Sequence, residues 1–229
     1  MASRRSYGSY NDGCAAAHAL DLIGERWTMI VVRELLLGPK RFSDIQRDVL
    51  GIGPAVLTQR LHDLEASGIA HRRRLPGLGR IDVYELTEWG YGLEAVNTAL
   101  SLWAVSSPAL PREADMSPDT MILAMRAHAR PVSGPSNERR VALRLTDSRR
   151  QDAEPVTYVA RMSERSTSID RLLEPQQPDA EVAATTKDWK ACVIGGVPLE
   201  LLPNIRISGT HDAVRQLISA TGGIRTGTS

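Results

Sequence analysis

The feature that most constrains the fold is a pair of predicted helices separated by a glycine-rich turn. Ser43 is expected to cap the first of them, with Gln46 three residues later as its capping-box partner. Residues 51–53 (GIG) form the turn, and Pro54 suits the first turn of the second helix, where its missing N–H would be unpaired anyway. This second helix is expected to end at Gly68. The spacing therefore predicts a helix-turn-helix.

The second of these helices is amphipathic. With 100° between successive residues, Leu57, Leu61 and Leu64 form one narrow apolar stripe that is expected to face the core. The opposite face carries Ala55, Thr58, Gln59 and His62. Such a face is either ordinary solvated surface or the part of a helix-turn-helix that enters the major groove of DNA.

The residue types on this outward face match the chemistry of base edges. Gln59 can pair through two hydrogen bonds with adenine, and Thr58 can bond to a base edge or a phosphate. The methyl group of Ala55 can contact a thymine methyl. The face is therefore a candidate base-reading surface.

A basic hairpin is predicted directly after this helix. Residues 69–75 and 80–86 alternate like strands around the glycine-rich segment 76–79. The chain as a whole is balanced, with 28 Lys and Arg against 27 Asp and Glu, so affinity for nucleic acid requires a local patch. The hairpin supplies one, because it carries Arg72, Arg73, Arg74 and Arg80, which can contact phosphates or enter the minor groove.

Helices are expected on both sides of this segment. Residues 14–23 and 27–37 have helical apolar spacing, the second almost wholly buried. Thr87 is expected to cap a further helix. Its apolar positions are Leu93, Val96, Leu100 and Trp103.

Proline and serine mark a boundary after this helix. We expect a first domain over residues 1–106, a linker over 107–116 and a second domain over 117–229. The second domain reads as a helix opening at Ser117, strands, then closing helices with one short strand between them. The expected strands are 141–145, 156–160, 166–172, 181–185 and 205–207, and the closing helices 189–194, 198–202 and 211–219. The fold class is therefore α+β: a winged helix-turn-helix followed by an α+β sheet-and-helix domain of a ligand-binding type.

Several classes of protein are disfavoured. Two cysteines are too few for a disulfide framework, and five histidines show no metal spacing, so we expect no metal and no cofactor. The sequence has no nucleophile elbow, zincin motif or phosphate loop, so we do not expect an enzyme. It also lacks a signal peptide and a membrane span, and a cytoplasmic location is expected.

Several collinear segments resemble the HxlR family of bacterial winged helix-turn-helix regulators. They are residues 14–27 (CAAAHALDLIGERW), 33–45 (RELLLGPKRFSDI), 51–61 (GIGPAVLTQRL) and 84–90 (YELTEWG). The resemblance implies a homodimer, built partly from the terminal helices of this domain, on a pseudo-palindromic operator in double-stranded DNA. The residues expected to contact DNA are Ser43, Pro54, Ala55, Thr58, Gln59, Arg60, His62, Arg72, Arg73, Arg74 and Arg80.

Cys14 matches an N-terminal cysteine of that family, which senses oxidants or electrophiles in some members. A helix N-terminus can activate a thiol at this position. The simpler expectation is a small buried core residue.

The second half resembles the sterol-carrier-protein type 2-like domain. The resemblance lies in residues 178–189 (PDAEVAATTKDW), the Gly195-Gly196 pair with 198–202 (PLELL), and 205–214 (IRISGTHDAV). It implies an apolar cavity between sheet and helices, although plain core packing is the simpler role for each residue. The candidate lining residues are Met121, Met125, Tyr158, Ile169, Trp189 and Val193.

Two functions follow as hypotheses. The first is a DNA-binding transcriptional regulator whose second domain binds a hydrophobic small-molecule effector. The alternative is a carrier of a lipid-like ligand, or an enzyme, built on a winged-helix dimer scaffold. The near-neutral charge of the first half and Ala55 keep this alternative open.

Overall fold

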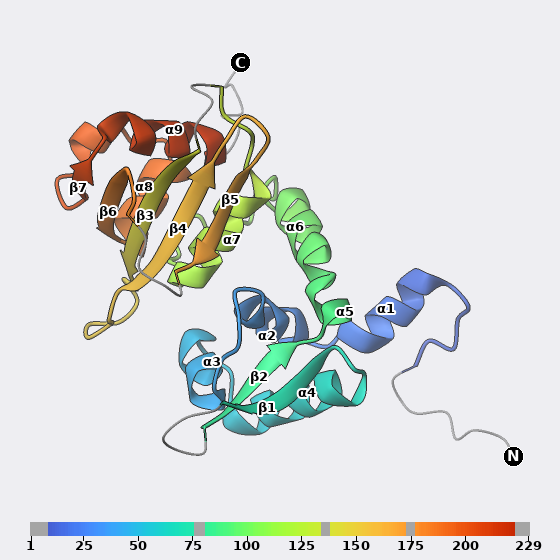
Figure 1. Ribbon diagram of the computed structural model, residues 1–229. Coiled ribbons are helices and arrows are strands. Elements are labelled where there is room, and N and C mark those ends of the chain that lie inside the picture. Colours follow the sequence, from blue (N-terminus) through green and yellow to red (C-terminus); the bar gives the residue numbers. More distant parts are fainter. Residues whose placement is uncertain (1–8, 76–80, 134–137, 173–176, 223–229) are drawn as a thin grey trace, which may run out of the picture. The chain divides into compact units, whose positions relative to one another are not determined.

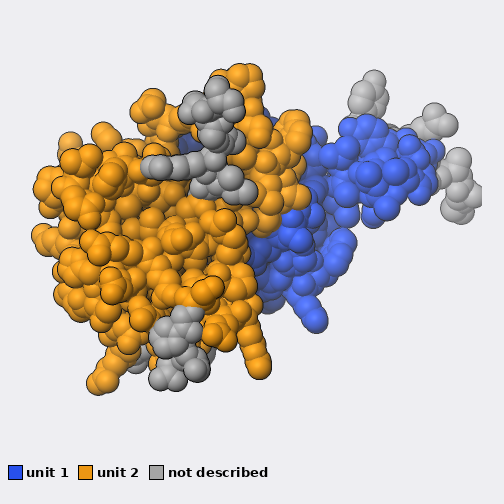
Figure 2. All heavy atoms as spheres, turned by 90° about the horizontal axis from the view of Figure 1, so that it is seen from above, with its two compact units in different colours: residues 1–97 blue, residues 98–229 orange. Residues whose placement is uncertain are grey.

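The chain folds into two compact units, residues 1–97 and 98–229 (Figure 2). The computed structural model describes residues 9–75, 81–133, 138–172 and 177–222. The division between the units lies inside helix α6 (Leu93–Ala104), whereas the composition of the sequence places the domain boundary at residue 106.

Unit 1 has the element order that the sequence predicts, except that the single helix expected after Thr87 is divided into α5 and α6 at Gly92 (Figure 1). Its helices and strands are α1 (Ala15–Ile23), α2 (Thr28–Leu35), α3 (Phe42–Asp48), α4 (Pro54–Ala66), β1 (Ala70–Leu75), β2 (Ile81–Leu86) and α5 (Glu88–Tyr91), followed by the start of α6. β1 and β2 pair in antiparallel register, which confirms the hairpin. Its tip, residues 76–80, lies outside the described residues and includes Arg80.

The core of unit 1 forms around α4. Leu57, Leu61 and Leu64 are at most 1% exposed, which confirms the predicted apolar stripe. Pro54 occupies the first turn of α4, as predicted. Burial of one face fixes the direction of the other, so the outward residues of α4 are presented to solvent.

The start of α3 differs from the prediction. The helix begins at Phe42, so Ser43 lies inside its first turn and Arg41 occupies the N-cap without a side-chain hydrogen bond. The backbone N–H groups of Asp44 and Ile45 both bond to the Arg41 carbonyl, at 3.1 Å. The predicted capping box at Ser43 is therefore wrong, because the backbone turns into the helix two residues earlier.

The junction after the hairpin depends on a glycine. Thr87 caps α5 as predicted, since its Oγ1 accepts a hydrogen bond from the N–H of Gly90 at 3.0 Å. A Cβ atom at Gly90 would lie 2.0 Å from the carbonyl oxygen of Ile69. Only glycine allows α5 to approach the start of the wing this closely.

Unit 2 is a mixed sheet with helices on one face (Figure 1). After α7 (Pro118–Ala127) come β3 (Arg139–Thr146), β4 (Val156–Met162), β5 (Thr167–Arg171), β6 (Ala180–Thr185), α8 (Thr186–Val193), the short 3-10 helix η1 (Leu199–Leu201), β7 (Arg206–Gly209) and α9 (His211–Thr221). The strand order is β5-β4-β3-β6-β7, and β3 with β6 is the parallel pair. The strands and helices predicted for this half are confirmed, except that residues 198–202 form a single 3-10 turn.

The two faces of this sheet differ in chemistry. On β3, Val141, Leu143 and Leu145 are buried beneath the helices, and the alternate residues Arg140 and Arg144 are exposed. The uncovered face of the sheet therefore carries exposed arginines on either side of the buried Ala142.

The residues proposed from sequence to line an apolar cavity lie on the helix-covered side. Met121, Met125, Tyr158, Ile169, Trp189 and Val193 are all at most 3% exposed. Trp189 Nε1 lies 3.3 Å from Met125 Sδ, and the Tyr158 hydroxyl donates to Asp119 Oδ1 at 2.5 Å. These side chains form part of the core of unit 2.

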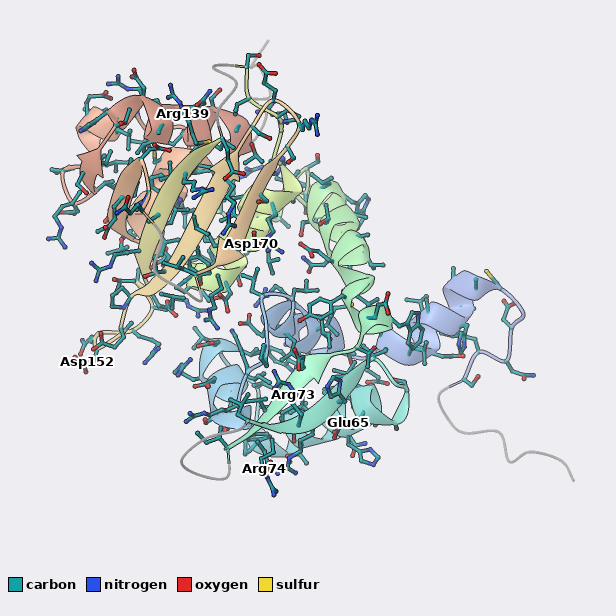
Figure 3. The ribbon with its side chains drawn as sticks, viewed as in Figure 1. Glu65, Arg73, Arg74, Arg139, Asp152 and Asp170 are labelled. Atoms are coloured by element: carbon teal, nitrogen blue, oxygen red, sulfur yellow. The ribbon has the colours of Figure 1, made fainter. Side chains whose placement is uncertain are left out.

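Helix α7 is fixed to the edge strand β5 through Arg126. Its guanidinium donates to the Ile169 carbonyl and to Asp170 Oδ1, both at 2.6 Å; Figure 3 labels Asp170 on this strand.

In the part of the chain that the structure describes, no helix is both long and apolar enough to span a bilayer.

Candidate nucleic-acid interface

The outward face of α4 presents the predicted residues to solvent. Ala55, Thr58, Gln59 and His62 are all exposed. Thr58 Oγ1 donates to the Pro54 carbonyl at 2.9 Å, and Gln59 Nε2 donates to Asp63 Oδ1 at 2.7 Å. The Gln59 amide keeps its oxygen and its second N–H for a base edge, so Asp63 orients it without exhausting its hydrogen-bonding capacity.

Arg60 does not share this face. Its side chain is only 16% exposed, and its Nη1 lies 3.5 Å from Glu25 and 3.6 Å from Asp63. Its Nε is buried and has no hydrogen-bond partner among the described residues. Arg60 therefore points toward the turn between α1 and α2 rather than outward with Gln59, which differs from the placement expected from sequence.

The wing arginines are distributed over both faces of the hairpin. Arg72 and Arg74 alternate with Arg73 along β1, so they project on one side of the ribbon and Arg73 on the other. Figure 3 labels Arg73 and Arg74 on β1, beside Glu65 of α4. Glu65 accepts a hydrogen bond at 3.0 Å from the backbone N–H of Arg72, which ties the wing to α4.

Each described wing arginine has an acidic partner on β2. Asp82 accepts from Arg72 at 2.5 Å and from Arg74 at 3.3 Å, and Glu85 accepts from Arg73. The hydrogen bond from Arg72 lowers the pKa of Asp82, and the same bond raises the pKa of Arg72. Asp82 and Glu85 therefore offset much of the positive charge that the sequence predicts for this hairpin.

A buried ionic cluster connects the helix-turn-helix to the wing. Lys40 Nζ lies 2.8 Å from Glu34 Oε2 and 3.0 Å from Asp48 Oδ2, and the side chains of Lys40 and Glu34 are almost fully buried. The backbone of Lys40 also exchanges two hydrogen bonds with Tyr84 of β2, at 3.0 and 2.8 Å. The cluster thus joins α2, α3 and β2.

Sequence reasoning missed this cluster. Burial by itself would raise the pKa of Asp48, but hydrogen bonds from Arg47 and Lys40 outweigh it, and the pKa lies below its ordinary value. The available signal was the rarity of lysine: Lys40 is one of very few in a chain whose cations are mostly arginine.

Cys14 is exposed and directly precedes α1. The backbone N–H groups of Ala17 and Ala16, at the start of α1, lower the pKa of the thiol. The expectation of a buried core cysteine is wrong, because α1 buries none of its residues.

Large apolar side chains remain exposed on the terminal helices of the predicted first domain. Leu20 of α1 is 53% exposed, and on α6 Leu100 and Trp103 are 48% and 81% exposed. They occupy the apolar positions of helices that bury no residue within one chain. Such a surface is typical of a protein interaction site.

A helix-turn-helix with an exposed polar second helix, followed by a hairpin bearing arginines, defines a winged-helix transcriptional regulator. The comparisons with known proteins identify the family. The profile of the HxlR-like helix-turn-helix family matches residues 22–109. The chain is 37% identical over 86 residues to the HTH-type transcriptional regulator YodB of Bacillus subtilis (strain 168), covering 38% of this chain and 77% of YodB. It therefore belongs to the HxlR family of helix-turn-helix transcriptional regulators.

Another relative is also an HTH-type transcriptional regulator by name. The uncharacterized HTH-type transcriptional regulator YybR of B. subtilis (strain 168) is 32% identical over 107 residues, or 47% of this chain and 86% of YybR. Similar solved structures include the reduced form of B. subtilis YodB, with 34% identity, TM-score 0.39 and coverage of 42% of this chain and 95% of that one. The redox regulator HypR in its oxidized form has 33% identity, TM-score 0.40 and coverage of 42% and 100%. Both relatives found by sequence similarity are HTH-type transcriptional regulators by name.

Proposed function

We propose that this protein regulates transcription by binding a pseudo-palindromic operator in double-stranded DNA as a homodimer. The observation that carries the proposal is the two-sided character of α4. Its leucine stripe is locked in the core, and its opposite face presents Ala55, Thr58, Gln59 and His62 to solvent. In each subunit this face reads base edges in the major groove, and the wing arginines contact phosphates.

The exposed apolar surface on α1 and α6 supports a dimer. Large apolar side chains gathered along exposed helices are typical of an interface, and a second copy of the same helices would cover them symmetrically. A twofold pair of α4 helices then matches two operator half-sites about one DNA turn apart.

The direct test is a fluorescence-anisotropy titration of the DNA upstream of the protein's own gene at several salt concentrations. Specific binding should show a steep negative slope of log K against log salt. Gln59→Ala should relax the base preference by about 1–3 kcal/mol, whereas Arg73→Ala should weaken binding to all sequences alike.

The pairing of the wing arginines with Asp82 and Glu85 favours a second candidate function. In that function the chain carries a lipid-like ligand, or is an enzyme, and the winged-helix dimer serves as a scaffold. Weak binding that is blind to sequence, with no effect of Gln59→Ala, would support this alternative and refute the regulator.

We further propose that unit 2 has a sterol-carrier-like fold and binds a hydrophobic effector between its helices and its sheet. Met121, Met125, Tyr158, Ile169, Trp189 and Val193 line this site. The support is that all six are buried on the helix-covered side and that Trp189 contacts Met125. The effector changes DNA affinity only if it binds the free and the DNA-bound dimer unequally.

Native mass spectrometry of the full chain purified from its own cells tests the effector site. The original protein should retain an apolar molecule, and Trp189→Ala should lose it. Leu201→Ala, which changes an exposed residue of η1, is the control and should retain the molecule. The absence of any retained molecule counts against the effector site.

Cys14 is proposed as an oxidant-sensitive thiol. Its exposure and lowered pKa raise the thiolate fraction, and the thiolate is the form that peroxide oxidises to sulfenic acid. Cys192 is an internal control, because burial raises the pKa of its thiol. Mass spectrometry after mild peroxide treatment should find modification at Cys14 and not at Cys192, and an unmodified Cys14 would remove the proposal.

A further inference from the structure

A cavity of about 390 Å³ lies on the sheet of unit 2, away from the predicted effector residues. Its lining residues come from β3, β6 and β7 and from the segments before β4 and β7. They are Arg144, Thr146, Pro155, Ala183, Ala184, Thr185, Pro203, Asn204 and Arg206. The volume is within the range of small-molecule sites.

The strand register places two arginines symmetrically about an alanine. Arg144 of β3 is the register partner of Ala183 on β6, and Ala183 is the register partner of Arg206 on β7. Figure 1 shows β6 between β3 and β7. Register partners project to the same side of a sheet, so both guanidinium groups rise from the uncovered face on either side of the Ala183 methyl group.

This spacing suits a single bound anion. Two strand intervals separate the Cα atoms of Arg144 and Arg206 by about 10 Å, and each long side chain can reach toward the middle. The short Ala183 side chain leaves that middle open. A guanidinium group is a planar donor that matches an oxyanion through paired hydrogen bonds.

The other lining residues add polar groups and apolar walls. Thr146 supplies a hydroxyl and Asn204 an amide, while Pro155, Pro203 and Ala183 are apolar. Within the described part of the chain, the lining includes no acidic residue. Glu181 Oε1 lies 3.4 Å from Arg144 in an exposed pair that a stronger acceptor can displace.

We propose that this cavity binds a small organic anion, with a carboxylate or phosphate group held between Arg144 and Arg206 and a compact apolar body against the prolines. The site goes beyond the proposed function, because it lies on the opposite face of the sheet from the predicted effector residues and needs no DNA. Its occupant differs in charge from a hydrophobic effector.

Amide-resolved NMR titration of the full chain tests the site, with benzoate and inorganic phosphate as separate probes. Benzoate should cause saturable shifts at the amides of Ala183 and Arg206, with a Kd of about 1 mM or tighter. Arg144→Gln and Arg206→Gln should each weaken binding about tenfold or more, as expected for loss of a charge-assisted hydrogen bond.

Two variants separate this geometry from general positive charge. Glu181→Gln removes the acid that competes for Arg144 and should tighten benzoate binding. Arg140→Gln is the matched control, because Arg140 lies on the same strand and face but outside the cavity, paired with Glu138 at 2.9 Å. It should leave the affinity within about twofold, less than the effect of one hydrogen bond.

Three results overturn the proposal. One is the absence of saturable benzoate shifts up to about 10 mM, tenfold above the expected Kd. Another is binding of phosphate without benzoate, which would leave the apolar walls without a role. The third is an equal loss of affinity in Arg140→Gln and Arg206→Gln, which would reduce the site to diffuse surface charge.

Discussion

Replacing Asp82 should strengthen DNA binding, because this carboxylate holds two of the wing arginines. Arg72 and Arg74 both donate to Asp82, whereas Glu85 holds Arg73. Asp82→Asn keeps the shape of the side chain and removes the charge, so two guanidinium groups become available to phosphates.

The expected size of the effect follows from this count. Each arginine that gains a phosphate steepens the slope of log K against log salt by about 0.9. Asp82→Asn should therefore steepen the slope by up to about 1.8, and Glu85→Gln by about half as much. The gain in affinity should be largest at low salt and shrink as salt is added, because released counterions drive it.

Fluorescence anisotropy with one operator duplex at four or more salt concentrations measures both slopes. Asp152→Asn is the control, since it makes the same change in net charge at an exposed position of unit 2. A slope for Asp82→Asn no steeper than that of Asp152→Asn would refute the idea that the wing arginines are held back from DNA by their acidic partners.

Three further predictions concern the same unit. Gln59→Ala should reduce discrimination between operator and mutated operator by about 1–3 kcal/mol in competition binding, and unchanged discrimination would show that another residue reads the bases. Asp48→Asn should lower the free energy of unfolding in urea by about 1.5 kcal/mol at pH 7. The folded-state pKa of Asp48 is lowered, so its carboxylate stabilises the fold above the pKa of the unfolded state, near 4, and this stabilisation is lost as pH falls. The difference in unfolding free energy between Asp48→Asn and the original protein should therefore vanish in acid. A difference that does not change with pH would contradict this reasoning. Gly90→Ala forces a Cβ against the Ile69 carbonyl and should destabilise by about 1–3 kcal/mol or more, whereas Gly13→Ala, with open space around its Cβ, should have little effect on the same urea curve.

Local sequence signals predicted the elements of this protein well. Helix α4 could be placed from Pro54 and the leucine spacing, because both act within a few residues of the chain. The hairpin and the strands of unit 2 followed from alternation, for the same reason. The start of α3 could not be placed, because Ser43 is a good cap in isolation and only the backbone path decides whether it is used.

The sequence predicted which residues of α4 are exposed at the candidate site, but not which charged side chains there form ion pairs. The exposure of Gln59 follows from its angle to the leucine stripe, which sequence alone provides. The inward position of Arg60 follows from the same geometry, because it lies about 300° around the helix from Leu57 and beside Leu64. Its ion pair with Glu25 does not, because Glu25 belongs to a different part of the chain.

The sequence by itself determined which residues form helices and strands, which face of α4 is buried, and the family resemblance, because periodicity, caps and motifs depend on neighbours along the chain. Only the tertiary structure decided which charges meet. It brings Asp82 and Glu85 of β2 to the wing arginines of β1 and Lys40 to the buried Glu34. It also places Arg144 and Arg206, from two different strands, on either side of Ala183. Electrostatic energy depends on the distance between charges and on their burial, and the spacing of residues along a chain determines neither.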